Sequence, residues 1–187
     1  MTTRTYGTFP RTISCIMVAV ALIMLATPVW AQNGVSELCP GGLRTVDLVD
    51  DLPDLSCADL SGADLTGTNL TDADLSGADL TDAVLNSAIL TGATLTDADL
   101  TGAYLFGTVL TDADLTGAVL TGADLTRAFL VDANLIWANL TRANLRGADL
   151  TGTRLTDAFL TGASYDSATQ FPPGFDPEAE GMILIEE

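Results

Sequence analysis

The 187-residue sequence predicts an all-β protein whose chain winds as a parallel β-solenoid. A leucine stands at every fifth position from Leu55 to Leu160, 22 times in succession. An alanine stands two positions before 18 of the last 21 of these leucines, and threonine takes that place at Thr68, Thr108 and Thr153. The two residues after each leucine are mostly those of turns: Thr or Ser, then Gly, Asp, Ser or Arg.

A five-residue period fits neither a helix nor a continuous strand. Five residues advance a helix by about 500°, so the leucines would spiral around its axis. In a strand they would alternate between opposite faces. The chain must therefore take one short extended step and turn a corner within every five residues. With each leucine and its preceding alanine facing inward, successive turns of the chain stack through parallel β-bridges.

Residues 1–31 predict a secretory signal peptide with cleavage after Ala31. Two basic residues and no acidic residue flank an apolar run, and short side chains stand at −3 and −1 from the cleavage point: Arg4, Arg11, Val29 and Ala31. An uncleaved anchor is the alternative, because residues 13–31 are almost long enough to span a bilayer. Cleavage predicts a mature chain in the periplasm or outside the cell, with no attachment to the membrane.

Residues 32–52 form a predicted N-terminal leader that caps the first turn of the repeat. Cys39 and Cys57 are the two cysteines of the mature chain, one in this leader and one in the first repeat. In an exported protein such a pair is typically a disulfide, which would tie the leader to the repeat. Two buried thiols are the alternative.

The composition excludes several classes of function. The chain has 25 acidic and seven basic residues and no histidine, which gives a net charge of −18. Such a surface repels nucleic acids and anionic membranes. Without histidine or lysine there is no Ser–His or Cys–His pair and no Schiff-base amine. The unbroken register leaves no inserted loop to build a cleft, so we expect no enzymatic activity and no cofactor.

The units ADLSG, ADLTG, ADLTD, ANLTR and ANLRG resemble the repeats of the pentapeptide repeat family. The resemblance extends over about residues 53–165. It implies a right-handed quadrilateral parallel β-helix with four pentapeptides, hence about 20 residues, per coil and about five and a half coils. Residues 166–187, which end in TQFPPGFDPEAEGMILIEE, resemble the endings of bacterial members and are expected to cap the last coil.

A coil of this length stacks residues that are 20 apart in sequence, and one group of stacked outward residues is apolar. Ile89, Val109 and Phe129 share one column, Val84 and Tyr104 share the next, and Phe106 lies nearby. We call these six residues the apolar ladder: Val84, Ile89, Tyr104, Phe106, Val109 and Phe129. A continuous apolar patch on an acidic rod is a candidate surface for a protein partner or for self-association. The alternative is that β-branched and aromatic residues are simply favourable stacking residues in a sheet.

Two other stacked groups have a local explanation. A column of hydroxyls could order water as an ice-binding surface: Ser61, Thr81, Thr101, Thr121, Thr141 and Thr161. However, Thr and Ser follow most of the leucines, where their hydroxyls bond to nearby backbone. A column of acids could attract Ca²⁺: Asp59, Asp79 and Asp99. Because a calcium site requires six or more converging oxygens, solvated carboxylates are the favoured interpretation and no metal is expected.

Two functions are therefore considered. The first is an exported, non-catalytic protein-binding or structural module whose partner the sequence does not identify. The second follows from the resemblance, because some family members inhibit DNA gyrase by mimicking the shape and charge of duplex DNA. That function requires a cytoplasmic protein, and those inhibitors dimerise through C-terminal helices. This tail is instead interrupted by helix-breaking residues: Pro172, Pro173, Gly174 and Pro177.

Overall fold

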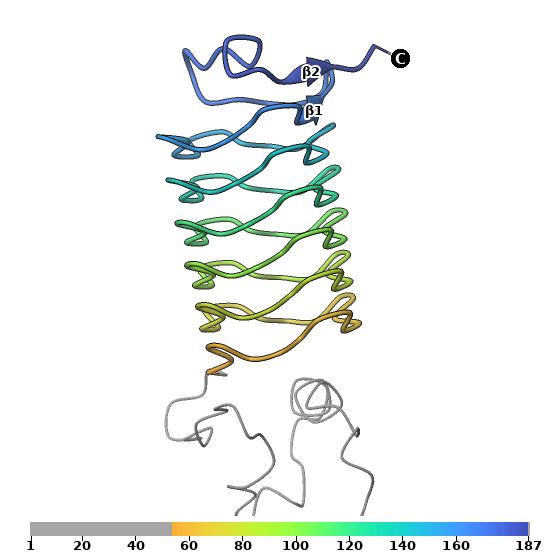
Figure 1. Cartoon of the computed structure of the whole chain (residues 1–187), viewed down its shortest axis with the longest axis vertical. Coiled ribbons are helices and arrows are strands. Elements are labelled where there is room, and N and C mark those ends of the chain that lie inside the picture. Colours follow the sequence, from red (N-terminus) through yellow and green to blue (C-terminus); the bar gives the residue numbers. More distant parts are fainter. Residues whose placement is uncertain (1–53, 187) are drawn as a thin grey trace, which may run out of the picture.

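A computed structural model describes residues 54–186, which form a rod of stacked turns closed at its C-terminal end (Figure 1). The predicted signal peptide (1–31), the leader (32–52) and Cys39 lie outside the described residues. Two short strands occur at the end of the rod, β1 (Ser164–Tyr165) and β2 (Ile183–Leu184), and they pair in parallel. Isolated parallel bridges join the preceding turns to one another.

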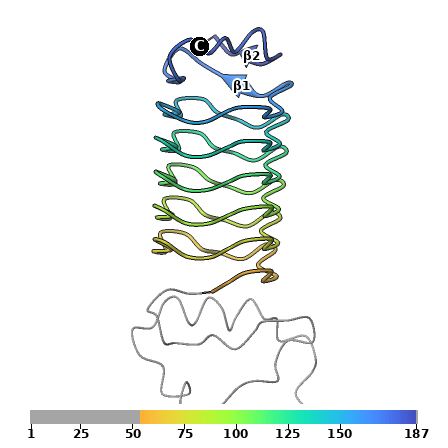
Figure 2. The same ribbon diagram turned by 90° about the vertical axis from the view of Figure 1, so that its left-hand side faces the viewer.

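The bridges show how the turns stack. The residue before each leucine, which we call the ladder residue, pairs with the ladder residue 20 positions later, as in Ile89–Val109–Phe129. The amide of Leu90 donates to the carbonyl of Val109 at 2.7 Å, and the amide of Val109 donates to that of Ala88 at 2.9 Å. Four such bridged columns run along the rod, so each turn is held to its neighbours on every side (Figure 2).

The core is a column of leucines, which confirms the prediction of inward leucines. Every repeat leucine from Leu60 to Leu150 is at most 1% exposed, and the alanines two positions earlier line the same column. Burying each leucine contributes about 1.5–3 kcal/mol before the loss of chain entropy is subtracted. The threonines that replace alanine are also buried, and Thr108 and Thr153 donate their hydroxyl protons to carbonyls of the preceding turn.

The corners explain the remaining repeat positions. The residue two positions after each leucine, which we call the corner residue, has a left-handed backbone whether it is Gly92 (φ 68°) or Asp72 (φ 55°). An Asp or Asn at the ladder position accepts a hydrogen bond from the amide two residues later, as Asp99 does from Thr101 at 2.9 Å. The recurrent acids and threonines are therefore turn residues, which supplies a structural reason for the acidic and hydroxyl columns.

The last coil contains one additional residue. Asp149 bridges Gln170, which is 21 positions away rather than 20, so the chain bulges within residues 166–169. Thr169 returns to the inner position, where its one hydroxyl proton is shared between the carbonyl of Leu145 at 3.0 Å and Oδ1 of Asp166 at 3.1 Å. The extra residue opens one corner of the rod without breaking the stack.

Residues 171–186 lie across the open end of the leucine column. Tyr165 and Phe171 meet edge to face with ring centroids 5.4 Å apart, and Phe171 stacks on Phe175 at 5.1 Å. The tail then returns over the last corner, and the amide of Ile183 donates to the carbonyl of Ala163 at 2.8 Å. Apolar and backbone groups of the final coil are thereby covered. Among residues 54–186, no helix has the length and apolar character required to cross a membrane.

Candidate binding surface

The apolar ladder occupies two neighbouring columns in the middle of the rod. Ile89, Val109 and Phe129 are joined by successive bridges, and Val84 is bridged to Tyr104 in the adjacent column. Side chains of Ile89, Tyr104 and Phe129 are 40%, 51% and 50% exposed, whereas Val84 and Val109 are half-buried. The structure therefore places these residues in continuous outward rows.

Phe106 lies on the corner that joins these two columns and is 43% exposed. The residues stacked after it are polar. The guanidinium of Arg127 lies 5.9 Å from the centre of the Phe106 ring, within the range of a cation–π contact. The aromatic edge of the apolar ladder therefore adjoins a cationic side chain.

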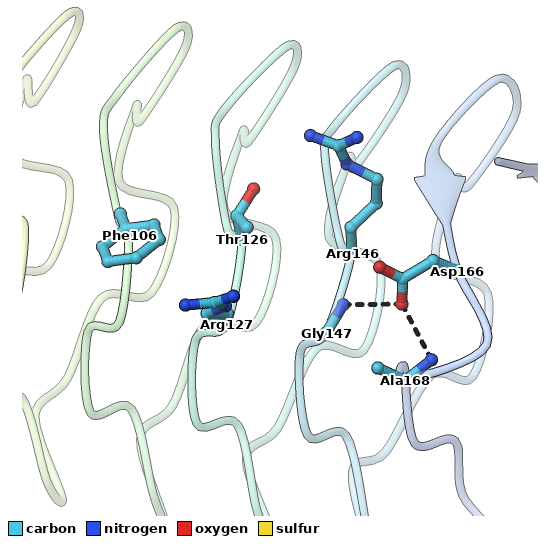
Figure 3. A pocket seen from close by; sticks show the side chains of 7 residues that line it. All are labelled: Phe106, Thr126, Arg127, Arg146, Gly147, Asp166 and Ala168. Atoms are coloured by element: carbon cyan, nitrogen blue, oxygen red, sulfur yellow. Dashed lines mark hydrogen bonds between the residues drawn. The ribbon is translucent and has the colours of Figure 1, made fainter. Parts of the chain in front are cut away.

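Beyond Phe106 the corner is hollowed into a surface cavity of about 380 Å³. We call it the arginine groove, and Figure 3 shows its lining: Phe106, Thr126, Arg127, Arg146, Gly147, Asp166 and Ala168. In the figure the guanidinium of Arg127 turns toward Phe106, while Arg146 extends away from Asp166. The groove is lined from four successive turns because its residues are about one coil apart in sequence.

Both arginines have neutral contacts that orient them. The Nε of Arg146 donates to Oδ1 of Asn144 at 3.2 Å. The stem of Arg127 passes beneath Gly147, where an added Cβ would lie 3.3 Å from its Cγ. Within residues 54–186 neither guanidinium forms an ion pair with a carboxylate of the chain. Two cationic groups without a carboxylate partner among the described residues therefore face solvent at this corner.

Asp166 is held by the bulge of the last coil. Its Oδ1 accepts hydrogen bonds from the amide of Gly147 at 2.9 Å, the amide of Ala168 at 3.0 Å and the hydroxyl of Thr169 at 3.1 Å. Desolvation acts to raise the pKa of this carboxyl, but the hydrogen bonds together outweigh it and lower the pKa below the ordinary 3.8. Asp166 is therefore ionised at neutral pH. Its carboxylate accepts the hydrogen bond that the Gly147 amide, like other corner amides, would otherwise donate to a backbone carbonyl of the next coil.

Charge is divided along the rod. Residues 54–126 contain 12 aspartates and no basic residue, whereas residues 127–165 contain four arginines and three aspartates. The arginine groove spans the boundary, because Phe106 and Thr126 belong to the acidic half and its other lining residues follow that half. A band of nearly neutral surface thus follows a strongly acidic one, although the overall charge is −18.

The sequence prediction did not identify the arginine groove. Its signal was present in the spacing, because the residues that directly follow the inward residues at one corner run Thr66, Asn86, Phe106, Thr126, Arg146 and Asp166, and Arg127 is the corner residue beside Thr126. Reading only the ladder column concealed that an aromatic residue and two arginines adjoin. Two further exposed aromatic residues, Trp137 and Phe159, each 61% exposed, were also missed. Trp137 donates from its indole nitrogen to Asp157 at 3.2 Å.

The remaining sequence predictions concern cysteine and metal. Cys57 occupies an exposed corner position with φ 56°, and its Sγ lies beneath Gly77. Its predicted bond to Cys39 concerns a residue beyond the described range and stays a prediction. Within the described range, no group of three His, Cys, Asp or Glu side chains lies close enough to hold a metal ion.

Comparison with known proteins identifies the repeat. The family described as pentapeptide repeats matches residues 58–97, 98–135 and 130–164, in eight copies. No curated protein matched the sequence. The structure is similar to that of Rfr23, a pentapeptide repeat protein from the cyanobacterium Cyanothece 51142, with 45% identity and a TM-score of 0.50. That match covers 50% of this chain and 63% of Rfr23.

A second similar structure is a pentapeptide repeat protein from the thylakoid lumen of Arabidopsis thaliana. It is 39% identical, with a TM-score of 0.51, and the match covers 56% of this chain and 70% of that protein. The family match spans more than half of the sequence and coincides with the stacked coils described above. The chain therefore belongs to the pentapeptide repeat family, whose members fold as β-helices.

Proposed function

We propose that this protein is an exported, non-catalytic module that binds another protein chain through the apolar ladder. The observation that carries this proposal is the row of exposed apolar side chains fixed by backbone bridges at Ile89, Val109 and Phe129. Because the bridges hold these side chains in place before binding, a partner meets a preorganised surface and little ordering entropy is lost.

The composition of the surface also supports a protein partner. Aromatic residues and arginine are enriched at protein interfaces and supply most of their binding energy. Here Tyr104 and Phe129 lie in neighbouring bridged columns, Phe106 lies on the corner between those columns, and Arg127 lies over the Phe106 ring. Export is supported by the signal-peptide pattern of residues 1–31 and by the similar protein from a thylakoid lumen.

Mimicry of DNA is the second candidate, and the acidic half of the rod favours it. Twelve aspartates without a basic residue in residues 54–126 give a surface charge of the sign that a duplex carries. The four arginines between Arg127 and Arg154 interrupt this charge over the rest of the coils. Export would also separate the protein from a cytoplasmic gyrase, so we favour the protein-binding module.

Fractionation of the host, followed by N-terminal sequencing, tests the compartment. We expect a chain that begins at Gln32 in the periplasm or the medium. A full-length chain in the cytoplasm would contradict export, and inhibition of gyrase supercoiling would then be measured.

Substitution of Phe129 by Asp tests the binding surface. We expect the native complex of the wild-type protein, a self-associated form or a complex with a partner, to shift to monomer size in sedimentation velocity. The charge would be placed in the middle of an apolar contact and would remain unpaired there. The matched control is Phe159→Asp, which changes an equally aromatic ladder residue in a different column.

The two variants separate the possible outcomes. Phe129 and Phe159 are both exposed, so both variants should retain the melting temperature of the parent. A complex that survives Phe129→Asp, or that Phe159→Asp disrupts equally, would contradict the apolar ladder as the interface. A wild-type protein that sediments as a monomer in host extract would contradict the function itself.

A further inference from the structure

The arginine groove combines three kinds of side chain that together determine which ligand could bind there. Its walls contain two guanidinium groups, one aromatic ring and one carboxylate within a single cavity of about 380 Å³. A cavity of this size accommodates a small molecule or ion together with some of its water. The groove shares Phe106 and Arg127 with the edge of the proposed protein-binding surface, but the bridged row of Ile89, Val109 and Phe129 does not line it.

The guanidinium groups are suited to an oxyanion. Arginine presents a planar set of N–H donors that matches the oxygens of phosphate and carboxylate groups. Arg127 is positioned by the Phe106 ring at 5.9 Å, and Arg146 by Asn144 at 3.2 Å, so each terminal pair of nitrogens is left for an external acceptor. Cations that are oriented by neutral groups retain their full charge for a ligand.

The opposite wall supplies hydrogen-bond acceptors. The hydrogen bonds from Gly147, Ala168 and Thr169 all reach Oδ1 of Asp166, and its other carboxylate oxygen receives none from the described residues. The hydroxyl of Thr126 donates its proton to Asp124, so toward the groove it too can only accept. A ligand that fits must therefore offer a proton to this wall as well as negative charge to the arginines.

We propose that the arginine groove binds inorganic phosphate: the guanidinium groups of Arg127 and Arg146 turn inward from the positions in Figure 3 to contact its charged oxygens, and Asp166 accepts the proton of its P–OH group. At neutral pH inorganic phosphate carries negative charge and at least one hydroxyl. Sulfate has the same shape but no proton, so it would meet the Asp166 carboxylate as an unrelieved like charge. The carboxylate in the wall therefore selects phosphate over sulfate. A phosphate monoester, whose second pKa is about 6, has mostly lost its last proton at pH 7 and is also disfavoured.

Binding is tested by titrating the full-length chain with sodium phosphate at pH 7 and constant ionic strength, followed by nuclear magnetic resonance. We expect saturable shifts of the Nε–H signals of Arg127 and Arg146 and of the Gly147 and Ala168 amides. Sodium sulfate and phenyl phosphate should each bind at least about tenfold more weakly. Shifts that rise linearly without saturation, or equal affinity for sulfate, would overturn the proposal.

Arginine variants test the site itself. Arg127→Gln and Arg146→Gln should each weaken phosphate binding by about tenfold or more. Arg142→Gln is the matched control, because Arg142 also occupies a corner position, with φ 59° against 57° for Arg127, and is also followed one coil later by glycine. It lies on another corner, so its substitution should leave the affinity unchanged. An equal loss in all three variants would show attraction by general charge and would overturn the site.

Asp166→Asn tests the selectivity. The variant keeps an acceptor oxygen for the Gly147 amide and replaces the outward carboxylate oxygen by an N–H donor. We expect phosphate and sulfate to bind it within about twofold of each other. Continued preference for phosphate in this variant would show that Asp166 does not select the ligand. A retained cooperative thermal transition confirms that any loss of binding in this variant is not a loss of fold.

Discussion

At the scale of single residues, each corner side chain restricts what the next coil can place above it. An added Cβ on Gly92 would overlap Oδ1 of Asp72, the corner residue 20 positions earlier. The same relation holds for three further pairs of corner residues: Asp82 and Gly102, Asp97 and Gly117, and Asp132 and Gly152. A glycine one coil after a corner aspartate therefore reflects that aspartate's side chain as much as its own backbone angle.

This relation predicts that Gly92→Ala destabilises the protein more than Gly122→Ala. Both glycines have nearly the same φ, 68° and 69°, so both alanines carry the left-handed penalty of about 1–2 kcal/mol. Only Gly92 has a neighbour in the way, because nothing lies within 4 Å of a Cβ on Gly122. Displacing the Asp72 carboxylate should add about 1 kcal/mol to the free energy lost, measured by urea unfolding.

A variant that lacks the Asp72 carboxylate supplies the control. In an Asp72→Ala background, Gly92→Ala should cost no more than Gly122→Ala does in the wild-type chain. An unchanged difference between the two glycines in that background would mean that the neighbouring carboxylate does not explain the choice of residue.

At the scale of elements, the C-terminal closure depends on a side chain that takes the place of backbone. Regular corner amides donate to a carbonyl of the next coil, as that of Arg127 does to Arg146 at 2.9 Å. The bulge removes this acceptor from Gly147, and Asp166 and Thr169 supply replacements. An unpaired amide at this junction would be costly, so the closure is specified by polar residues as well as by the aromatic cluster.

Because a carboxylate takes the place of a backbone carbonyl at this junction, the stability of the folded protein depends on pH in the acidic range. Because the pKa of Asp166 is lowered in the folded state, its carboxylate contributes stability that is fully present above pH 3.8. That contribution is lost as the pH falls through the folded pKa. Asp59 and Asp64 respond in the same direction, since hydrogen bonds from Ser61 and Thr66 lower their pKa values.

We therefore expect urea unfolding of the wild-type protein to show a larger loss of stability below pH 3.8 than the Asp166→Asn variant shows. Comparing the two proteins cancels the general effect of protonating the other carboxylates. Parallel stability curves in this range would contradict the assigned role of Asp166.

At the scale of the whole molecule, stability is distributed along one leucine column. We expect Leu105→Asp to abolish cooperative unfolding, because a carboxylate would enter a position that is 0% exposed and has no partner there. Tyr104→Asp adds the same charge one residue earlier, in a column that already contains Asp64 and Asp124, and should retain the fold. Circular dichroism during heating distinguishes them, and a cooperative transition in Leu105→Asp would contradict the inward column.

The leucine period made the interior of the rod predictable, because one side chain in five determines which way every other residue points. The outward positions of Ile89, Val109 and Phe129 followed from the same counting. The bulge at residues 166–169 did not, since Thr169 resembles any other repeat threonine until Gln170 is seen to pair with Asp149. The arginine groove depends on side-chain direction, and sequence spacing does not reveal that Arg127 turns toward Phe106.

The 20-residue spacing of the bridges has a consequence for how such a protein can change its length. Deleting residues 81–100 joins Leu80 to Thr101 and leaves every column in phase with the closure at the C-terminal end. Deleting only residues 81–85 shifts the upper coils by one side of the rod relative to the lower ones. We expect the longer deletion to be the more stable of the two in thermal unfolding, and the reverse order would contradict this. Insertions or deletions of 20 residues can therefore change the length of the rod and keep its columns in register. Insertions or deletions of five residues change which side chains stack on one another.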